Sequence, residues 1–94
     1  MPAPTPSPTP SPKLSAEQLD VLKGIADYRA KHERPPTTAE LAKFIRIRLE
    51  LVEYHLTELN DSGLVYCTLS FGAGAIWYLD QKGRGYLIAQ GLLK

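Results

Sequence analysis

The spacing of apolar positions changes along the chain, from a helical repeat in the first two thirds to strand-like runs in the last third. Leu19, Leu22 and Ile25 recur at helical spacing, which predicts the buried face of a first helix. Ser15 and the glutamine three residues later form a capping box, so this helix is expected to begin there. It is expected to end near His32, shortly before two prolines.

Two shorter helices are predicted next. Residues 37–40, Thr-Thr-Ala-Glu, form a second capping box and open a helix that runs through Phe44. A third helix is expected from about Leu49 to Asp61, and Gly63 supplies the left-handed residue that ends it. The apolar residues on one side of this third helix are expected in the core: Val52, Leu56 and Leu59.

The last third of the chain predicts a β-hairpin followed by one more helix. Residues 64–69 and 75–79 are rich in aromatic and β-branched side chains and flank a glycine-containing segment. Asp80 is placed to cap a helix over residues 81–93. The glycines of this helix are expected to allow close packing: Gly83, Gly85 and Gly91. The expected fold class is therefore α+β and mostly helical, with three helices, a hairpin and an added C-terminal helix.

Length and composition limit the chain to one small domain. The chain has 94 residues, and six of its eight prolines lie in the first twelve. We expect residues 1–13 to form a disordered Pro/Ser/Thr-rich tail and residues 14–94 to form the domain. No apolar run approaches the roughly 20 residues that a membrane span needs. We therefore expect a soluble, cytoplasmic protein that does not enter a membrane.

Nothing in the sequence predicts an enzyme. It offers no Ser-His-Asp spacing, no phosphate-binding loop and no pair of carboxylates in a plausible pocket. The lone Cys67 excludes an internal disulfide, and together with His32 and His55 it is a thin set of zinc ligands. We expect neither a metal nor a cofactor.

Two helices joined by a tight turn and followed by a hairpin are typical of winged helix-turn-helix domains. Residues 41–65, LAKFIRIRLELVEYHLTELNDSGLV, resemble the LAxxLxLxxxxVxxHLxxLxxxGLV pattern of winged-helix regulators, including MarR-like ones. Residues 15–79 also resemble the N-terminal DNA-binding domain of LexA-type repressors, at the Pro35-Pro36-Thr37 entry and the Ala39-Glu40-Leu41-Ala42 helix start. The resemblance implies a transcriptional regulator, such as a repressor, that reads double-stranded DNA with its third helix.

The same resemblance places the DNA contacts on and around the third helix. Arg46 and Arg48 precede this helix and can neutralise phosphates, whereas Tyr54 and Thr57 lie on its outward face. Arg46 stands where the family's turn usually has glycine, so we expect an altered turn or a strained Arg46. The candidate DNA-contacting residues are Thr38, Lys43, Arg46, Arg48, Leu49, Glu50, Glu53, Tyr54 and Thr57.

Charge keeps a second interpretation open. The net charge is only +1, and residues 45–65 carry two arginines against four carboxylates. The expected wing, residues 70–75, contains no lysine or arginine, so we expect weak DNA affinity unless the chain forms a homodimer. The residues expected to form the dimer contact are Tyr86, Leu87, Leu92 and Leu93. The alternative is a winged-helix module that binds another protein through its acidic third helix, which also carries Leu51.

Overall fold

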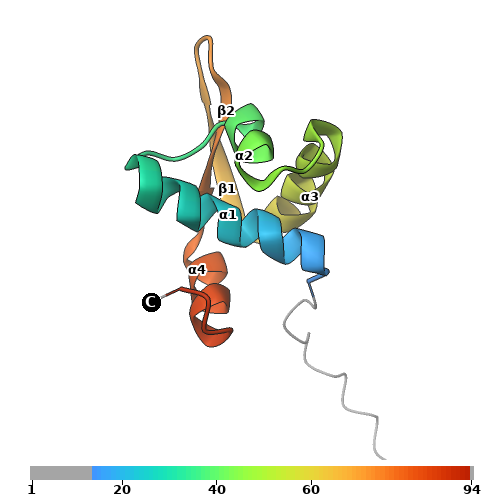
Figure 1. Cartoon of the computed structure of the whole chain (residues 1–94), viewed down its shortest axis with the longest axis vertical. Coiled ribbons are helices and arrows are strands. Elements are labelled where there is room, and N and C mark those ends of the chain that lie inside the picture. Colours follow the sequence, from blue (N-terminus) through green and yellow to red (C-terminus); the bar gives the residue numbers. More distant parts are fainter. Residues whose placement is uncertain (1–13, 94) are drawn as a thin grey trace, which may run out of the picture.

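Three helices, a β-hairpin and a last helix follow one another along the chain, as the sequence predicts (Figure 1). The computed structural model describes residues 14–93, so the tail expected over residues 1–13 lies outside the described residues. Within residues 14–93 no helix is long and apolar enough to cross a membrane. The elements are α1 (Ala16–His32), α2 (Thr38–Ile45), α3 (Leu49–Asp61), β1 (Val65–Ser70), β2 (Gly74–Leu79) and α4 (Gln81–Ala89).

Both predicted capping boxes are present. The Ser15 hydroxyl accepts a hydrogen bond from the Gln18 backbone N–H, and the Gln18 side chain accepts one from the Ser15 N–H, each at 3.1 Å. Thr37 and Glu40 make the same reciprocal pair at the start of α2, at 3.2 and 3.0 Å. Each box satisfies two backbone donors that a helix start would otherwise leave open. The starts of α1 and α2 are therefore fixed by local sequence.

The core lies where α1, α2 and α3 meet the inner face of the hairpin and the start of α4. Val52, Leu56 and Leu59 of α3 are buried there, as predicted. They pack with residues from every other element, so a single cluster connects the whole domain. The other completely or almost completely buried apolar members are Val21, Leu22, Ile25, Leu41, Leu64, Val65 and Leu87.

The hairpin is held to the helices by the segment that enters α2. β1 and β2 pair antiparallel, with Val65 opposite Leu79 and Ser70 opposite Gly74. On its other edge β2 donates the Trp77 backbone N–H to the Pro36 carbonyl oxygen at 2.9 Å. The far end of the hairpin projects well beyond the helices (Figure 1). This shape is the wing of a winged helix-turn-helix domain.

The last helix is shorter than predicted. It ends at Ala89 rather than at residue 93, because Gly91 adopts a left-handed φ of 74°. The Gly91 N–H bonds to the Ile88 carbonyl, and the Leu92 N–H bonds to the Leu87 carbonyl. These two bonds form a Schellman motif, which satisfies the last carbonyls and turns the chain away.

Close packing of glycine is confirmed at one of the three expected positions. A Cβ on Gly83 would overlap the Leu64 carbonyl oxygen, so α4 can approach the end of α3 only with glycine there. Apart from chain neighbours and nearby helix backbone, no atom of the described residues lies within 4 Å of the positions that a Cβ would take at Gly85 or Gly91. The prediction is therefore wrong for those two, since nothing packs against them in the described residues.

We predict opposite effects of adding one methyl group at two positions of α4. Gly83→Ala should lower the free energy of unfolding by about 1–3 kcal/mol, because the new methyl group collides with backbone that cannot move aside easily. Gly85→Ala should raise it by about 0.5–1 kcal/mol, because alanine favours the helix and its methyl group enters open space. Thermal melts of both variants test this. Equal melting temperatures would show that α4 does not pack on Leu64.

Candidate functional site

The outward face of α3 is the most prominent exposed surface of the helix-turn-helix. Tyr54 is 59% exposed and Leu49 is 45% exposed, although both are large and partly apolar. Leu51 beside them is 40% exposed. All five α3 residues predicted to face DNA are exposed together on this helix: Leu49, Glu50, Glu53, Tyr54 and Thr57.

The N-terminal end of α3 presents two arginines and open backbone donors. Arg48 is the N-cap residue, and no side chain caps this helix, so its first-turn N–H groups face solvent. Arg46 is also exposed, in the turn just before it. Arg48 lies 3.8 Å from the Glu50 carboxylate, but both side chains are about four-fifths exposed and the pair is weak. This end of α3 is chemically suited to an anion such as a phosphate.

The turn between α2 and α3 confirms the expected strain. Arg46 ends α2 in the left-handed region, with φ 59° and ψ 42°. A residue with a Cβ is disfavoured there, whereas glycine is not. The left-handed turn aims the chain into α3 over only three residues, and an arginine occupies the strained position.

Charge is distributed unevenly around this site. No lysine or arginine lies between Arg48 and Lys82. The same stretch contains five carboxylates, so α3 beyond its first residue is acidic and the wing has no cation. The wing instead exposes Leu69 and Phe71. The five carboxylates are Glu50, Glu53, Glu58, Asp61 and Asp80.

Two further candidate residues lie on α2. Lys43 is exposed near the end of that helix. Thr38 is half-buried, and its hydroxyl oxygen accepts a 2.7 Å hydrogen bond from the Trp77 indole N–H. This bond joins α2 to β2, so Thr38 has a structural role that the sequence did not indicate. A DNA contact by Thr38 stays a prediction.

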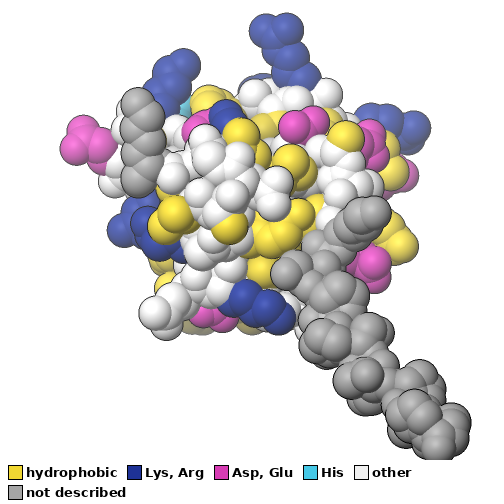
Figure 2. All heavy atoms as spheres, turned by 90° about the horizontal axis from the view of Figure 1, so that it is seen from below, with side chains coloured by type: hydrophobic (Ala, Val, Ile, Leu, Met, Phe, Trp, Pro, Cys, Tyr) yellow, Lys and Arg dark blue, Asp and Glu magenta, His cyan; other side chains and the backbone are white. Residues whose placement is uncertain are grey.

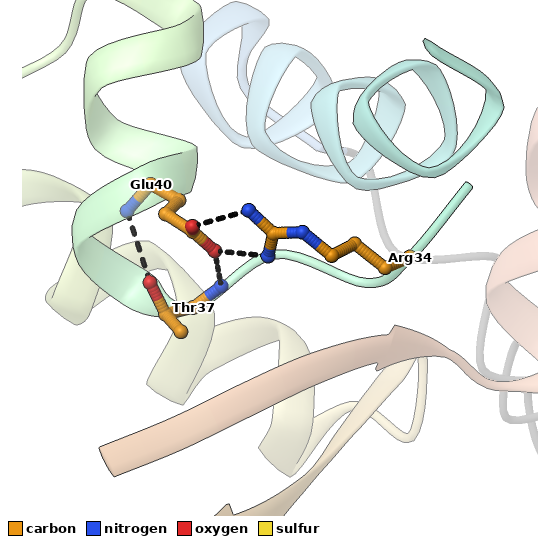
Figure 3. A network of polar contacts seen from close by, with 3 residues as sticks. All are labelled: Arg34, Thr37 and Glu40. Carbon is orange, nitrogen blue, oxygen red and sulfur yellow. Dashed lines mark hydrogen bonds and ion pairs between the residues drawn. The ribbon is translucent and has the colours of Figure 1, made fainter. Parts of the chain in front are cut away.

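An ion-pair network missed by the sequence analysis fixes the start of α2. Arg34 donates two hydrogen bonds to the Glu40 carboxylate, at 2.8 and 2.6 Å, while Glu40 also accepts from the Thr37 N–H (Figure 3). The Arg34 bonds, and then the Thr37 backbone bond, lower the pKa of Glu40 from 4.5 to about 2. The capping box predicted Glu40, but nothing in the spacing indicated that Arg34 folds back onto it.

His55 joins α3 to α1. Its Nε2 lies 3.1 Å from a carboxylate oxygen of Glu17, and its side chain is 10% exposed. It thus holds α3 against the first turn of α1. His55 is thus a structural histidine in the described residues.

The predicted dimer residues divide into two groups. Leu87 is completely buried in the domain's own core, so its placement at a dimer contact is wrong, because the helix turns it inward. Tyr86, Leu92 and Leu93 are half-buried, and Ile88, which was not predicted, is 54% exposed. Figure 2 views the molecule from the α4 side and shows apolar side chains gathered near the middle of that face.

The described residues include an open groove but no cluster of metal-binding side chains. Residues 14–93 contain no group of three or more His, Cys, Asp or Glu side chains that could hold a metal ion. A hollow of about 400 Å³ forms an open groove between α1, β2 and α4. Among others it is lined by Ile25, Trp77, Leu79 and Leu93, with Arg29 and Arg84.

Comparison with known proteins supports the fold through solved structures. No family model and no curated protein matches the chain. ZitR of Lactococcus lactis, a zinc-responsive MarR family member, is 19% identical with a TM-score of 0.70 over 88% of this chain and 55% of its own. MepR of S. aureus in complex with DNA is 19% identical with a TM-score of 0.66. The match covers 81% of this chain and 53% of the MepR chain. A MarR family regulator of Silicibacter pomeroyi is 20% identical with a TM-score of 0.64. This match covers 81% of this chain and 52% of the regulator.

These similarities confirm the winged helix-turn-helix fold and the resemblance to MarR-like regulators at the level of fold. The chain spans about half the length of the structures it matches. The resemblance to LexA-type repressors stays a prediction.

We predict that Glu40 stabilises the domain in a pH-dependent way. Because its pKa is depressed in the folded chain, its contribution is complete above pH 4.5 and is lost as the pH falls toward about 2. At pH 7, Glu40→Gln should lower the free energy of unfolding by about 1 kcal/mol. Urea unfolding of the two proteins at several pH values should show the difference disappearing over that interval. Arg34→Gln is the matched control and should remove most of the same pH dependence, because only the Thr37 backbone bond then remains; a difference between Glu40→Gln and the parent that persists at pH 2 contradicts the assignment.

Proposed function

We propose that this chain is a DNA-binding transcriptional regulator that contacts duplex DNA through α3. The observation that supports this most is the fold itself, which the chain shares with regulators that include MepR solved with DNA. In this chain α3 presents a continuous exposed face that no other described element covers. A helix in that position is suited to enter the major groove.

Phosphate contact is assigned to the N-terminal end of α3. Arg46, Arg48 and the open N–H groups of the first turn converge there, and Lys43 is exposed on the adjoining helix. Each phosphate neutralised by such a cation releases counterions and makes binding depend on salt. Three cations give a modest salt dependence, so we expect weak affinity from a single domain.

Base discrimination is assigned to the outward face beyond the arginines. The Tyr54 ring and hydroxyl are exposed, and Thr57 can accept a hydrogen bond while its own hydroxyl donates to the Glu53 carbonyl at 3.0 Å. Glu50 and Glu53 can accept from the amino group of cytosine. Their charge repels phosphates, so they oppose binding to DNA of arbitrary sequence.

We predict that Arg48→Ala weakens binding to all duplexes alike. It should also lower the salt slope, the slope of log affinity against log salt concentration, by about one unit. Arg46→Gly should lower the slope similarly while raising the melting temperature, because glycine removes the left-handed strain. Fluorescence anisotropy at several salt concentrations, paired with thermal melts, separates lost contact from lost folding. Glu50→Gln with Glu53→Gln should strengthen non-specific binding. If this double variant and Arg48→Ala both bind like the parent, α3 does not contact DNA.

We further infer that the chain forms a homodimer through α4. Ile88 is exposed beside half-buried Tyr86, Leu92 and Leu93, which together leave an apolar surface at the end of the domain. Two copies would double the DNA contacts and compensate for the few cations of one domain.

We predict that sedimentation of the parent at micromolar concentrations shows a dimer and that Ile88→Glu gives a monomer. The exposed position of Ile88 means that the change should leave the melting temperature of the monomer nearly unchanged. Gln90→Glu adds the same charge one residue beyond α4 and serves as the control. A parent that stays monomeric, or an Ile88→Glu variant that stays dimeric, rules out this interface.

A second candidate function is a protein-binding module that uses the same face of α3. The acidic charge of that face and the exposure of Leu49, Leu51 and Tyr54 favour it. Exposed aromatic and leucine side chains ringed by charge are common at protein interfaces. The anisotropy titration distinguishes the two functions, because a protein-binding face has no need of Arg48 to hold phosphates.

A further inference from the structure

A cluster of aromatic rings and cations lies away from α3, where the C-terminal end of α1 packs on α2. Tyr28 and His32 of α1 have ring centroids 4.2 Å apart. Phe44 of α2 meets Tyr28 edge-on at 5.3 Å and His32 at 6.1 Å. His32 is exposed and Phe44 is half-buried, so part of this ring cluster is open to solvent.

The rings form the walls of a shallow hollow. We call it the aromatic hollow. It has a volume of about 250 Å³ and is lined by Tyr28, His32, Phe44, Glu40 and Lys43. Arg34 holds the Glu40 carboxylate in a bidentate pair, so the negative charge in the hollow is already balanced.

Unbalanced positive charge surrounds the aromatic hollow. The Lys31 ammonium lies 5.9 Å from the centre of the Phe44 ring, and Lys43 lines the hollow itself. Within residues 14–93 neither lysine has a carboxylate within ion-pair distance. The residues around the aromatic hollow carry four positive charges and two negative charges, which gives a net charge of +2. The cations are Arg29, Lys31, Arg34 and Lys43, and the carboxylates are Glu33 and Glu40.

A ligand that fits must offer a flat ring and negative charge together. Nucleotides of a single strand do so, since each base can stack on an aromatic ring and each linkage carries a phosphate. Bases of intact duplex DNA are stacked on each other and cannot enter such a hollow. A peptide with acidic side chains would satisfy the lysines but not the rings.

We propose that the aromatic hollow binds single-stranded DNA, with a base stacked on Phe44 or His32 and flanking phosphates on Lys31 and Lys43. This site shares Lys43 with the duplex contact proposed for α3, but its rings and Lys31 lie outside that contact, and it does not depend on Arg46 or Arg48. It uses the cationic end of the domain, whereas α3 beyond Arg48 is acidic.

The test is binding of a short fluorescein-labelled oligothymidylate by the full chain. Phe44→Leu keeps an apolar side chain in place and should weaken binding by about fivefold or more, the usual effect of losing one stacked base. His32→Ala should also weaken the binding, and it changes an exposed side chain in the last turn of α1. Lys31→Ala with Lys43→Ala should lower the salt slope by about 1.4, or 0.7 for each phosphate.

Two controls keep the result specific. Lys23→Ala removes a cation of α1 that is paired with Asp27, and it should leave single-strand binding unchanged. Arg48→Ala should also leave it unchanged, although it weakens duplex binding if α3 contacts DNA. The proposal is overturned if the parent does not bind the oligonucleotide, if the ring and lysine variants bind like the parent, or if Arg48→Ala removes the binding. Failure of duplex binding alone overturns the proposed function and leaves this site standing.

Discussion

Trp77 makes the connection on which the winged arrangement depends. It donates its backbone N–H to Pro36 and its indole N–H to Thr38, so both of its donors end on the segment that enters α2. Thr37, between those two acceptors, caps α2. Pro36, Thr37 and Thr38 therefore hold both the wing and the start of α2 in place. Glu40, which bonds to the Thr37 N–H and to Arg34, also fixes the end of the loop that follows α1. This junction therefore ties the wing directly to the start of the helix-turn-helix.

Local signals in the sequence were sufficient for the helix starts and for α3. The capping boxes at Ser15 and Thr37 and the left-handed Gly63 each depend on neighbours within a few residues, so spacing alone predicts them. The end of α4 was predicted four residues too late, because Gly91 was interpreted as a packing position and not as the end of the helix.

The site was predictable as a face but not as a set of contacts. Helical spacing placed Tyr54 and Thr57 outward, whereas it could not show that Leu87 turns into the core. The bonds of Arg34 to Glu40 and of Trp77 to Thr38 join residues 6 and 39 positions apart. Such pairs form only when the elements have packed, and no periodicity in a single sequence carries that information.

The distribution of charge gives the domain two chemically different ends. Arg46 occupies a position that glycine would take at no cost, and a left-handed non-glycine residue costs of order 1 kcal/mol. No lysine or arginine follows Arg48 until Lys82, so Arg46 supplies one of the few cations next to α3. Lys31 and Lys43 add positive charge at the α1–α2 end, around exposed rings, and Arg84 adds it on α4. Positive charge therefore gathers before α3, at Arg46 and Arg48, and beside the rings of the α1–α2 end, whereas the face of α3 beyond Arg48 is acidic.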